Sequence, residues 1–193
     1  MRYLFLFCFL YTFSTMAQDK IPFESIPEAP EEMSSGAIIT RMIQGLGYRY
    51  HWASKDLREE DLVYRPTPEA ASTQETLVHL YGLAQTVFNT ASGVPSKRPI
   101  DHIPADYMDL RAGTLDYLKQ ASALFTGKNA DEIAALSVTF ERSGEQYPFS
   151  AWHLLNGPLA DAIYHTGQLV SFRRTTGNPI QKGVNVFTGK TKQ

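Results

Sequence analysis

Apolar residues recur three and four positions apart in four long segments of this chain, which is the spacing of one face of an α-helix. The predicted helices run from Ser34–Ser35 to near Lys55, from Ser72 to about Ser92, from Tyr107 to just before Gly127, and from Ser150 to Phe172. Amphipathic helices of this length bury their apolar faces against one another. We therefore predict an all-α fold, a four-helix bundle.

Local signals support these boundaries. Ser72 and Glu75 form a capping-box pattern, in which a hydroxyl and a carboxylate bond the free amides at the start of a helix. Gly93 follows the same helix and is typical of a helix end. Pro66 and Pro68 each remove an amide donor, so residues 56–71 are predicted to be a connection.

Two segments depart from the helical pattern. Residues 136–149 are rich in β-branched side chains and contain the turn dipeptide Ser143-Gly144, which predicts a short β-hairpin or an extended crossover before the last helix. Pro158 lies inside that last helix, where a proline breaks a backbone hydrogen bond. We expect the helix to bend there or to start twice, with Ser150 as its first cap and Asn156 as its second.

The first 17 residues have the pattern of a secretory signal peptide. Arg2 precedes an apolar run over residues 3–13, and the small residues Thr15 and Ala17 follow it. The run is shorter than the roughly 20 residues that a membrane-spanning helix needs. We predict cleavage after Ala17, export to the periplasm or the extracellular space, and no stable membrane insertion afterwards.

The predicted mature chain has three parts. Residues 18–33 are polar and contain three prolines, so we expect a flexible leader. The helical bundle is predicted over residues 34–180. Residues 181–193 form a C-terminal tail for which the pattern predicts no role.

Composition argues against some classes of function. The 193 residues include 18 Lys and Arg against 20 Asp and Glu, a formal net charge of −2, which does not favour a nucleic-acid partner. The single cysteine, Cys8, lies in the predicted signal peptide. The mature protein therefore has no disulfide, no thiol nucleophile and no cysteine-ligated zinc.

The most informative polar pattern is formed by two histidines and one aspartate. Asp161 and His165 are four residues apart in the last predicted helix, so they lie one turn apart on one face. His79 lies in the middle of the second predicted helix. Three such side chains are enough to hold a divalent metal ion with open coordination positions. The alternative from spacing alone is a hydrogen-bonded core histidine beside a helical Asp–His pair.

These residues also carry a family resemblance. The segment Glu75-Thr76-Leu77-Val78-His79-Leu80, followed far downstream by Asp161-Ala162-Ile163-Tyr164-His165-Thr166-Gly167-Gln168, resembles the DinB-like superfamily of metal-binding four-helix bundles, over about residues 36–180. Members typically carry one histidine on the second helix and the pattern H-x-x-x-H-x-G-Q on the last. In this chain Asp161 takes the place of the middle histidine. The resemblance is to an exported branch without an assigned activity.

The resemblance implies a metal site with His79, Asp161 and His165 as ligands. A carboxylate is a competent ligand, so zinc, nickel, iron and manganese all remain candidate ions. Gln168 is expected to hydrogen-bond a ligand, and Glu75 is either a further oxygen group at the site or only a helix cap, the interpretation we prefer. His51, Asn156 and Tyr164 are the remaining candidates for lining the site.

Several functions are compatible with such a site. Hydrolysis of an unidentified small-molecule substrate by metal-activated water is the expectation we favour, because it needs no exported cofactor. Metal-dependent thiol transfer, which the superfamily resemblance also implies, requires low-molecular-weight thiols that are mainly intracellular. The alternative from another functional class is a non-catalytic helical bundle that binds a partner, which could be a second copy of the same chain. In that case the histidines only complete the core.

Overall fold

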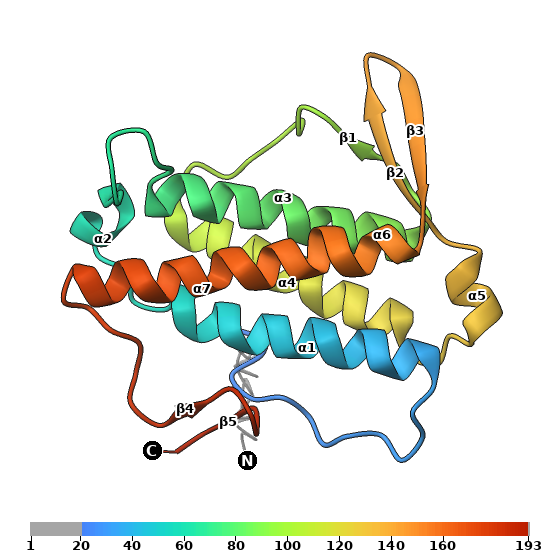
Figure 1. Ribbon diagram of the computed structural model, residues 1–193, viewed down its shortest axis with the longest axis horizontal. Coiled ribbons are helices and arrows are strands. Elements are labelled where there is room, and N and C mark those ends of the chain that lie inside the picture. Colours follow the sequence, from blue (N-terminus) through green and yellow to red (C-terminus); the bar gives the residue numbers. More distant parts are fainter. Residues whose placement is uncertain (1–20, 193) are drawn as a thin grey trace, which may run out of the picture.

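A computed structural model describes residues 21–192, and the predicted signal peptide lies outside them. The described chain is largely helical, as expected (Figure 1). Its four long helices lie side by side and are α1 (Ser35–Ser54), α3 (Thr73–Ser92), α4 (Tyr107–Phe125) and α7 (Ala160–Thr175). Helices α1 and α3 each pack against both α4 and α7, so that the four surround a common core.

The helix starts follow the predicted local chemistry. The Ser34 hydroxyl accepts a hydrogen bond from the Ala37 amide, and α1 begins at the next residue. Ser72 and Glu75 form the predicted capping box at the start of α3. Gly93 ends α3 in the left-handed conformation, at a φ of 70°, which glycine adopts without a steric penalty.

The connections contain short elements that the apolar pattern did not predict. These are α2 (Glu59–Val63), α5 (Ala130–Ala134) and strand β1 (Ser96–Lys97). The predicted hairpin is present as β2 (Ser137–Arg142) and β3 (Glu145–Ser150), which pair in antiparallel register from Ser137–Ser150 to Arg142–Glu145. Strand β1 pairs in parallel with β2, which leaves β3 at the edge of the sheet.

The last helix does not start at either predicted cap. Ser150 belongs to β3, and its hydroxyl lies 3.2 Å from Nδ1 of His153 rather than at a helix amide. Helix α6 (Trp152–Leu154) continues into a π-helical turn, η1 (Leu155–Leu159), and then into α7. Asn156 is an exposed residue inside this turn, and Gly157 has a non-helical ψ of −106°. The helix is therefore kinked at Gly157, just before Pro158, which confirms the expected bend.

The core between the long helices is built from aliphatic and aromatic side chains. Its fully buried members include Ile43, Leu46, Leu77, Leu80, Leu115, Leu118, Phe125, Leu159 and Leu169. On α4 the buried face is not formed by every apolar residue of the helix. Leu118 and Phe125 are buried, whereas Tyr117 is half-buried and Leu124 is exposed.

Part of the predicted leader, residues 22–27, contacts α1. Ile26 is buried with Tyr48 and Trp52 of α1 in a small second apolar cluster. Its amide donates to the Gly189 carbonyl at 2.8 Å, which joins the leader to the C-terminal tail. Prolines prevent a helix here, but they do not prevent burial of an apolar side chain.

The tail also has a structure that its sequence pattern does not predict. Strands β4 (Val184–Asn185) and β5 (Lys190–Thr191) form a small antiparallel pair. The Tyr48 hydroxyl lies 2.8 Å from the Thr191 hydroxyl and accepts a hydrogen bond from the Asn185 amide. The leader and the tail therefore cover the outer side of α1 together.

Two buried arginines cap the last turn of α1. Arg173 of α7 donates from Nη1 to the carbonyls of Trp52 and Ala53, at 3.1 and 3.2 Å. Arg111 of α4 donates from Nη2 to the His51 carbonyl at 3.1 Å. The last carbonyls of a helix have no partner inside it, and they carry the negative end of the helix dipole. Side chains from two other helices supply the missing donors.

The arrangement changes the expected role of the arginine pair at the end of α7. The sequence places Arg173 and Arg174 near the C-terminus of their own helix, where they are expected to complement its dipole. Arg174 is exposed, but Arg173 is only 4% exposed and points into the protein to cap α1. Tyr107 donates to the remaining carbonyl of this turn, that of Ser54.

A buried aspartate ties the end of α7 to α2. The Asp61 carboxylate is 1% exposed and accepts hydrogen bonds from Arg58, Thr176 and the Asn178 amide group, the last at 2.7 Å. Burial by itself raises the pKa of this carboxyl, but the hydrogen bonds, above all those from Arg58, outweigh it and hold the pKa well below the ordinary value.

Asp61→Asn is expected to reduce stability near neutral pH, and to reduce it by a smaller amount in acid. A carboxyl whose pKa is lower in the folded state adds stability above its unfolded pKa of about 3.9, and this contribution is lost as the pH falls through the folded value. The difference in unfolding free energy between wild type and variant, measured in urea, should shrink from pH 6 to pH 3. The exposed Asp116→Asn variant is the control. A difference that stays constant with pH would contradict this role.

Candidate metal centre

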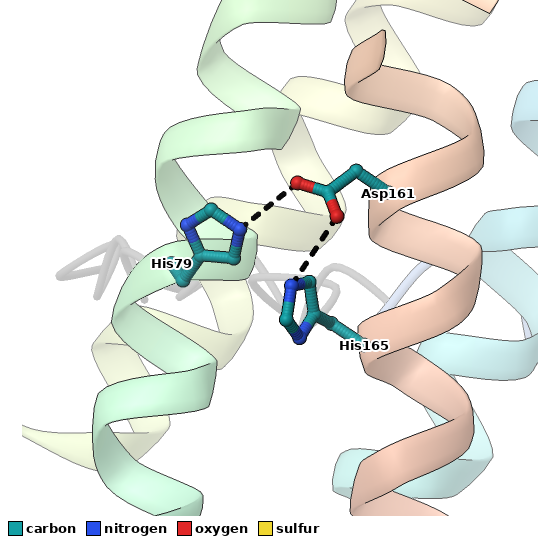
Figure 2. A group of neighbouring side chains, drawn as sticks. All are labelled: His79, Asp161 and His165. Carbon is teal, nitrogen blue, oxygen red and sulfur yellow. Dashed lines mark hydrogen bonds and ion pairs between the residues drawn. The ribbon is translucent and has the colours of Figure 1, made fainter. Parts of the chain in front are cut away.

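The two helices that carry the predicted ligands lie next to each other. His79 is on α3, while Asp161 and His165 follow one another on successive turns of α7. Figure 2 shows the three side chains converging between these helices, with the carboxylate of Asp161 directed toward both imidazole rings. The predicted convergence of residues 82 positions apart is thus present in the tertiary structure.

The ligand atoms are close enough to share one ion. Nε2 of His79 lies 3.0 Å from Oδ2 of Asp161, and Nε2 of His165 lies 3.3 Å from Oδ1 of the same carboxylate. One ligand atom from each residue can be chosen so that all lie within 4.8 Å of one another. Ligands of a tetrahedral ion with bonds of about 2.0–2.2 Å are roughly 3.5 Å apart, so the group fits a divalent metal.

Gln168 controls which nitrogen of His165 is available. Nδ1 of His165 lies 2.7 Å from Oε1 of Gln168, an amide oxygen that can only accept. Nε2 of the same ring lies 3.3 Å from Oδ1 of Asp161. At this distance the two atoms can share either a proton or a metal ion.

The centre is open to solvent on one side. The exposed fraction of the side chain is 47% for His79, 40% for Asp161 and 24% for His165. The rings of His79 and His165 meet edge to face, with centroids 4.5 Å apart. Three protein ligands at a half-exposed position leave coordination positions for water or a substrate, which is typical of a catalytic rather than a structural site.

The other candidate residues divide into those beside the centre and those elsewhere. Gln168 contacts a ligand directly, as expected, and the Tyr164 ring packs against the His165 ring with centroids 5.2 Å apart. The Glu75 carboxylate is used at the start of α3, where it accepts from the Ser72 amide at 2.7 Å and pairs with Arg65 at 3.1 Å. The preferred capping interpretation of Glu75 is the one that the structure supports.

His51 and Asn156 are not brought to the ligands. Nδ1 of His51 donates to the Pro22 carbonyl at 2.8 Å, and its ring packs against Trp52, so it holds the leader against α1. Burial lowers the pKa of this histidine. Asn156 lies exposed in the π-helical turn that precedes α7. The Gly157-Pro158 dipeptide signals an irregularity, but the sequence spacing does not predict a π-helical turn. This turn ends at Leu159, two residues before Asp161.

Comparisons with known proteins add no family assignment. Within residues 21–192, no helix combines the length and the apolarity that a membrane crossing requires. No protein-family model matches the sequence, and searches of curated proteins and of solved structures returned no significant match.

Proposed function

We propose that this chain is an exported, DinB-like four-helix bundle that binds one divalent metal ion through His79, Asp161 and His165. The observation that carries the proposal is the convergence of three ligand atoms, one each from His79, Asp161 and His165, that all lie within 4.8 Å of one another. A hydrogen-bonded core histidine would be buried, with its ring N–H directed at an acceptor and its other ring nitrogen directed at a donor. These side chains are instead half-exposed and directed at one point.

Each residue of the proposed site has a different role in holding an ion. Gln168 fixes the ring of His165 and its tautomer, which is the usual role of a hydrogen-bond partner behind a metal ligand. Asp161 supplies the negative charge and lies between the two imidazoles. His79 reaches the same point from the neighbouring helix, so the site depends on α3 packing against α7.

The proposed activity is hydrolysis of a small substrate. A bound divalent ion supplies Lewis acidity, which polarises a coordinated group and lowers the pKa of a coordinated water toward 7. Because the centre lies at the surface of α3 and α7, substrate has direct access to it. Tyr164, 65% exposed beside His165, offers a ring against which a substrate can pack.

Metal analysis of the purified mature protein tests the site. We expect close to one equivalent of a divalent metal in the wild type, and its loss in both His79→Ala and His165→Ala, because each change removes one of three ligands. The control is His153→Ala, since His153 is exposed and lies outside the group. Metal-free wild-type protein whose thermal stability does not change on metal addition would favour the non-catalytic bundle.

Activity is tested separately from binding. The metal-loaded protein is screened against small esters, amides and thiol-reactive electrophiles, with His165→Ala as the inactive reference. Hydrolysis of an ester or amide that disappears with the metal supports the proposal. Turnover only of an electrophile in the presence of an added thiol would replace hydrolysis by thiol transfer and leave the metal site intact.

A further inference from the structure

An apolar cavity lies at the end of the bundle where α1 begins, between the first turn of α1, α5 and the junction of β3 with α6 (Figure 1). Its volume is about 390 Å³, and none of its lining residues is charged. Isoleucines, alanines, Leu155 and Trp152 form most of the wall, and none of the metal-centre residues lines it. A cavity of about 150 Å³ already holds a benzene ring, so this one has room for an aromatic side chain.

Two apolar side chains of this wall are exposed in the single chain. The exposed fraction is 45% for Ile38 and 75% for Trp152. Isolated apolar side chains are common at a protein surface, but an apolar hollow with aliphatic and aromatic walls is typical of an interaction site. Burial of this surface against an apolar group would be favourable.

A matching apolar group lies at the turn between β4 and β5. Phe187 is 96% exposed and its neighbour Val186 is 46% exposed, and we call these two residues the hairpin tip. The side-chain oxygen of Asn185 accepts from the amides of Phe187 and Thr188, at 3.0 and 3.2 Å. The Gly189 amide donates to the Asn185 carbonyl at 2.8 Å. An ordered turn loses little conformational entropy when a partner buries its side chains.

The hairpin tip does not fill the cavity of its own chain. The base of the hairpin is held on α1, where Tyr48 contacts Thr191 and Asn185. Ile38, which lines the cavity, precedes Tyr48 by ten residues, or roughly 15 Å along the helix axis. The hairpin would have to leave Tyr48 to reach the cavity, so the group that fills it comes from another molecule.

The charges near the two surfaces are complementary. Residues 181–192 contain no acidic residue and three exposed lysines, which are Lys182, Lys190 and Lys192. Lys190 pairs with Glu28 of the leader at 3.1 Å, so the hairpin keeps an excess of positive charge. Helix α5 supplies part of the cavity wall and carries the exposed carboxylates of Asp131 and Glu132, against the one nearby lysine Lys128. Opposite charges at the edges of an apolar contact favour its formation and fix its orientation.

We propose that the hairpin tip of one chain inserts into the apolar cavity of a second copy of this chain. The lysines of the hairpin then lie toward the carboxylates of α5. The tip and the cavity are at different places on the molecule, so each chain offers its tip to one neighbour and its cavity to another. A contact made by one turn is smaller than the roughly 1,200 Å² of a stable interface, so the association is weak. The proposal does not depend on the metal centre.

Sedimentation equilibrium of the mature protein, freed of metal by a chelator and dialysis, measures the association up to about 1 mM protein. We expect the average mass of the wild type to rise with concentration. Phe187→Ser and Ile38→Asp should each remain monomeric, because one removes the tip and the other places a charge in the cavity wall. The control is Val63→Ser on α2, which is 73% exposed, belongs to neither surface and should associate like the wild type. Thermal unfolding checks that every variant folds.

A mixture of the two monomeric variants tests the orientation of the contact. Phe187→Ser keeps an intact cavity and Ile38→Asp keeps an intact tip, so an equimolar mixture should form one contact and reach at most twice the mass of one chain.

Three results would overturn the proposal. The first is a wild type that remains monomeric up to about 1 mM, and the second is wild-type association in Phe187→Ser. The third is a mixture of the variants that stays monomeric while the wild type associates, because the contact would then not join a tip to a cavity. Since all measurements use metal-free protein, none of these results bears on the metal centre.

Discussion

Arg173→Met is expected to lower the free energy of unfolding by about 3–5 kcal/mol, the largest stability effect of any single change considered. The substitution keeps much of the apolar stem but removes the guanidinium that bonds the carbonyls of Trp52 and Ala53 and both oxygens of Asn178. Each buried acceptor left without a donor costs about 1–3 kcal/mol. The end of α1 and the segment after α7 lose their common partner.

Urea or thermal unfolding measures this effect. For a domain of this size, about 3 kcal/mol corresponds to a fall in the melting temperature of roughly 6–12 °C. Arg174→Met is the matched control. The Arg174 side chain, next to Arg173 in the sequence, is exposed, and a surface substitution changes stability by about 0.5 kcal/mol or less. Equal unfolding free energies for the two variants would mean that water replaces Arg173 at the carbonyls.

Asp161→Ala is expected to weaken divalent-metal binding by at least about a hundredfold while leaving the fold of the metal-free protein intact. The carboxylate is the anionic member of the proposed ligand group and contacts both imidazoles. Loss of a hydrogen-bond partner behind a ligand already costs about 10–100-fold, and loss of a ligand costs more. The Asp161 side chain is 40% exposed, so its removal leaves no buried polar group unpaired.

A graded series of variants separates the roles at this site. Titration with a metal-sensitive dye should rank the affinities as wild type, then Gln168→Ala at roughly 10–100-fold weaker, then Asp161→Ala. Asp161→His should retain binding and shift preference toward ions that favour imidazole, such as zinc and nickel. Wild-type affinity in Asp161→Ala would remove the aspartate from the proposed site.

Local chemistry accounts for the helices that the sequence predicted well. Ser72 caps α3 and Gly93 ends it, because both act through backbone groups within a few residues of themselves. The docked leader could not be predicted in this way. Ile26 is stabilised by Tyr48 and Trp52, more than 20 positions away, and a polar, proline-containing composition carries no information about that contact.

The burial of the two arginines also depends on contacts that the local sequence does not specify. On α4, Arg111 falls on the spacing of Leu118 and Phe125, so the helical period contains a signal that it faces inward. Its charge argues for solvent, and only the carbonyls at the end of α1 explain why it is buried. Arg173 has the same explanation.

By itself the sequence determined the long helices and the spacing of Asp161 and His165 on one of them, because hydrogen bonds and side-chain contacts within a helix join residues three or four positions apart. Tertiary structure alone decided that His79 meets this pair, since that contact depends on how α3 packs against α7. It also decided the burial of Arg111 and Arg173, because their partners lie on another helix. Contacts between distant segments follow from the packing of complete faces, which no local pattern specifies.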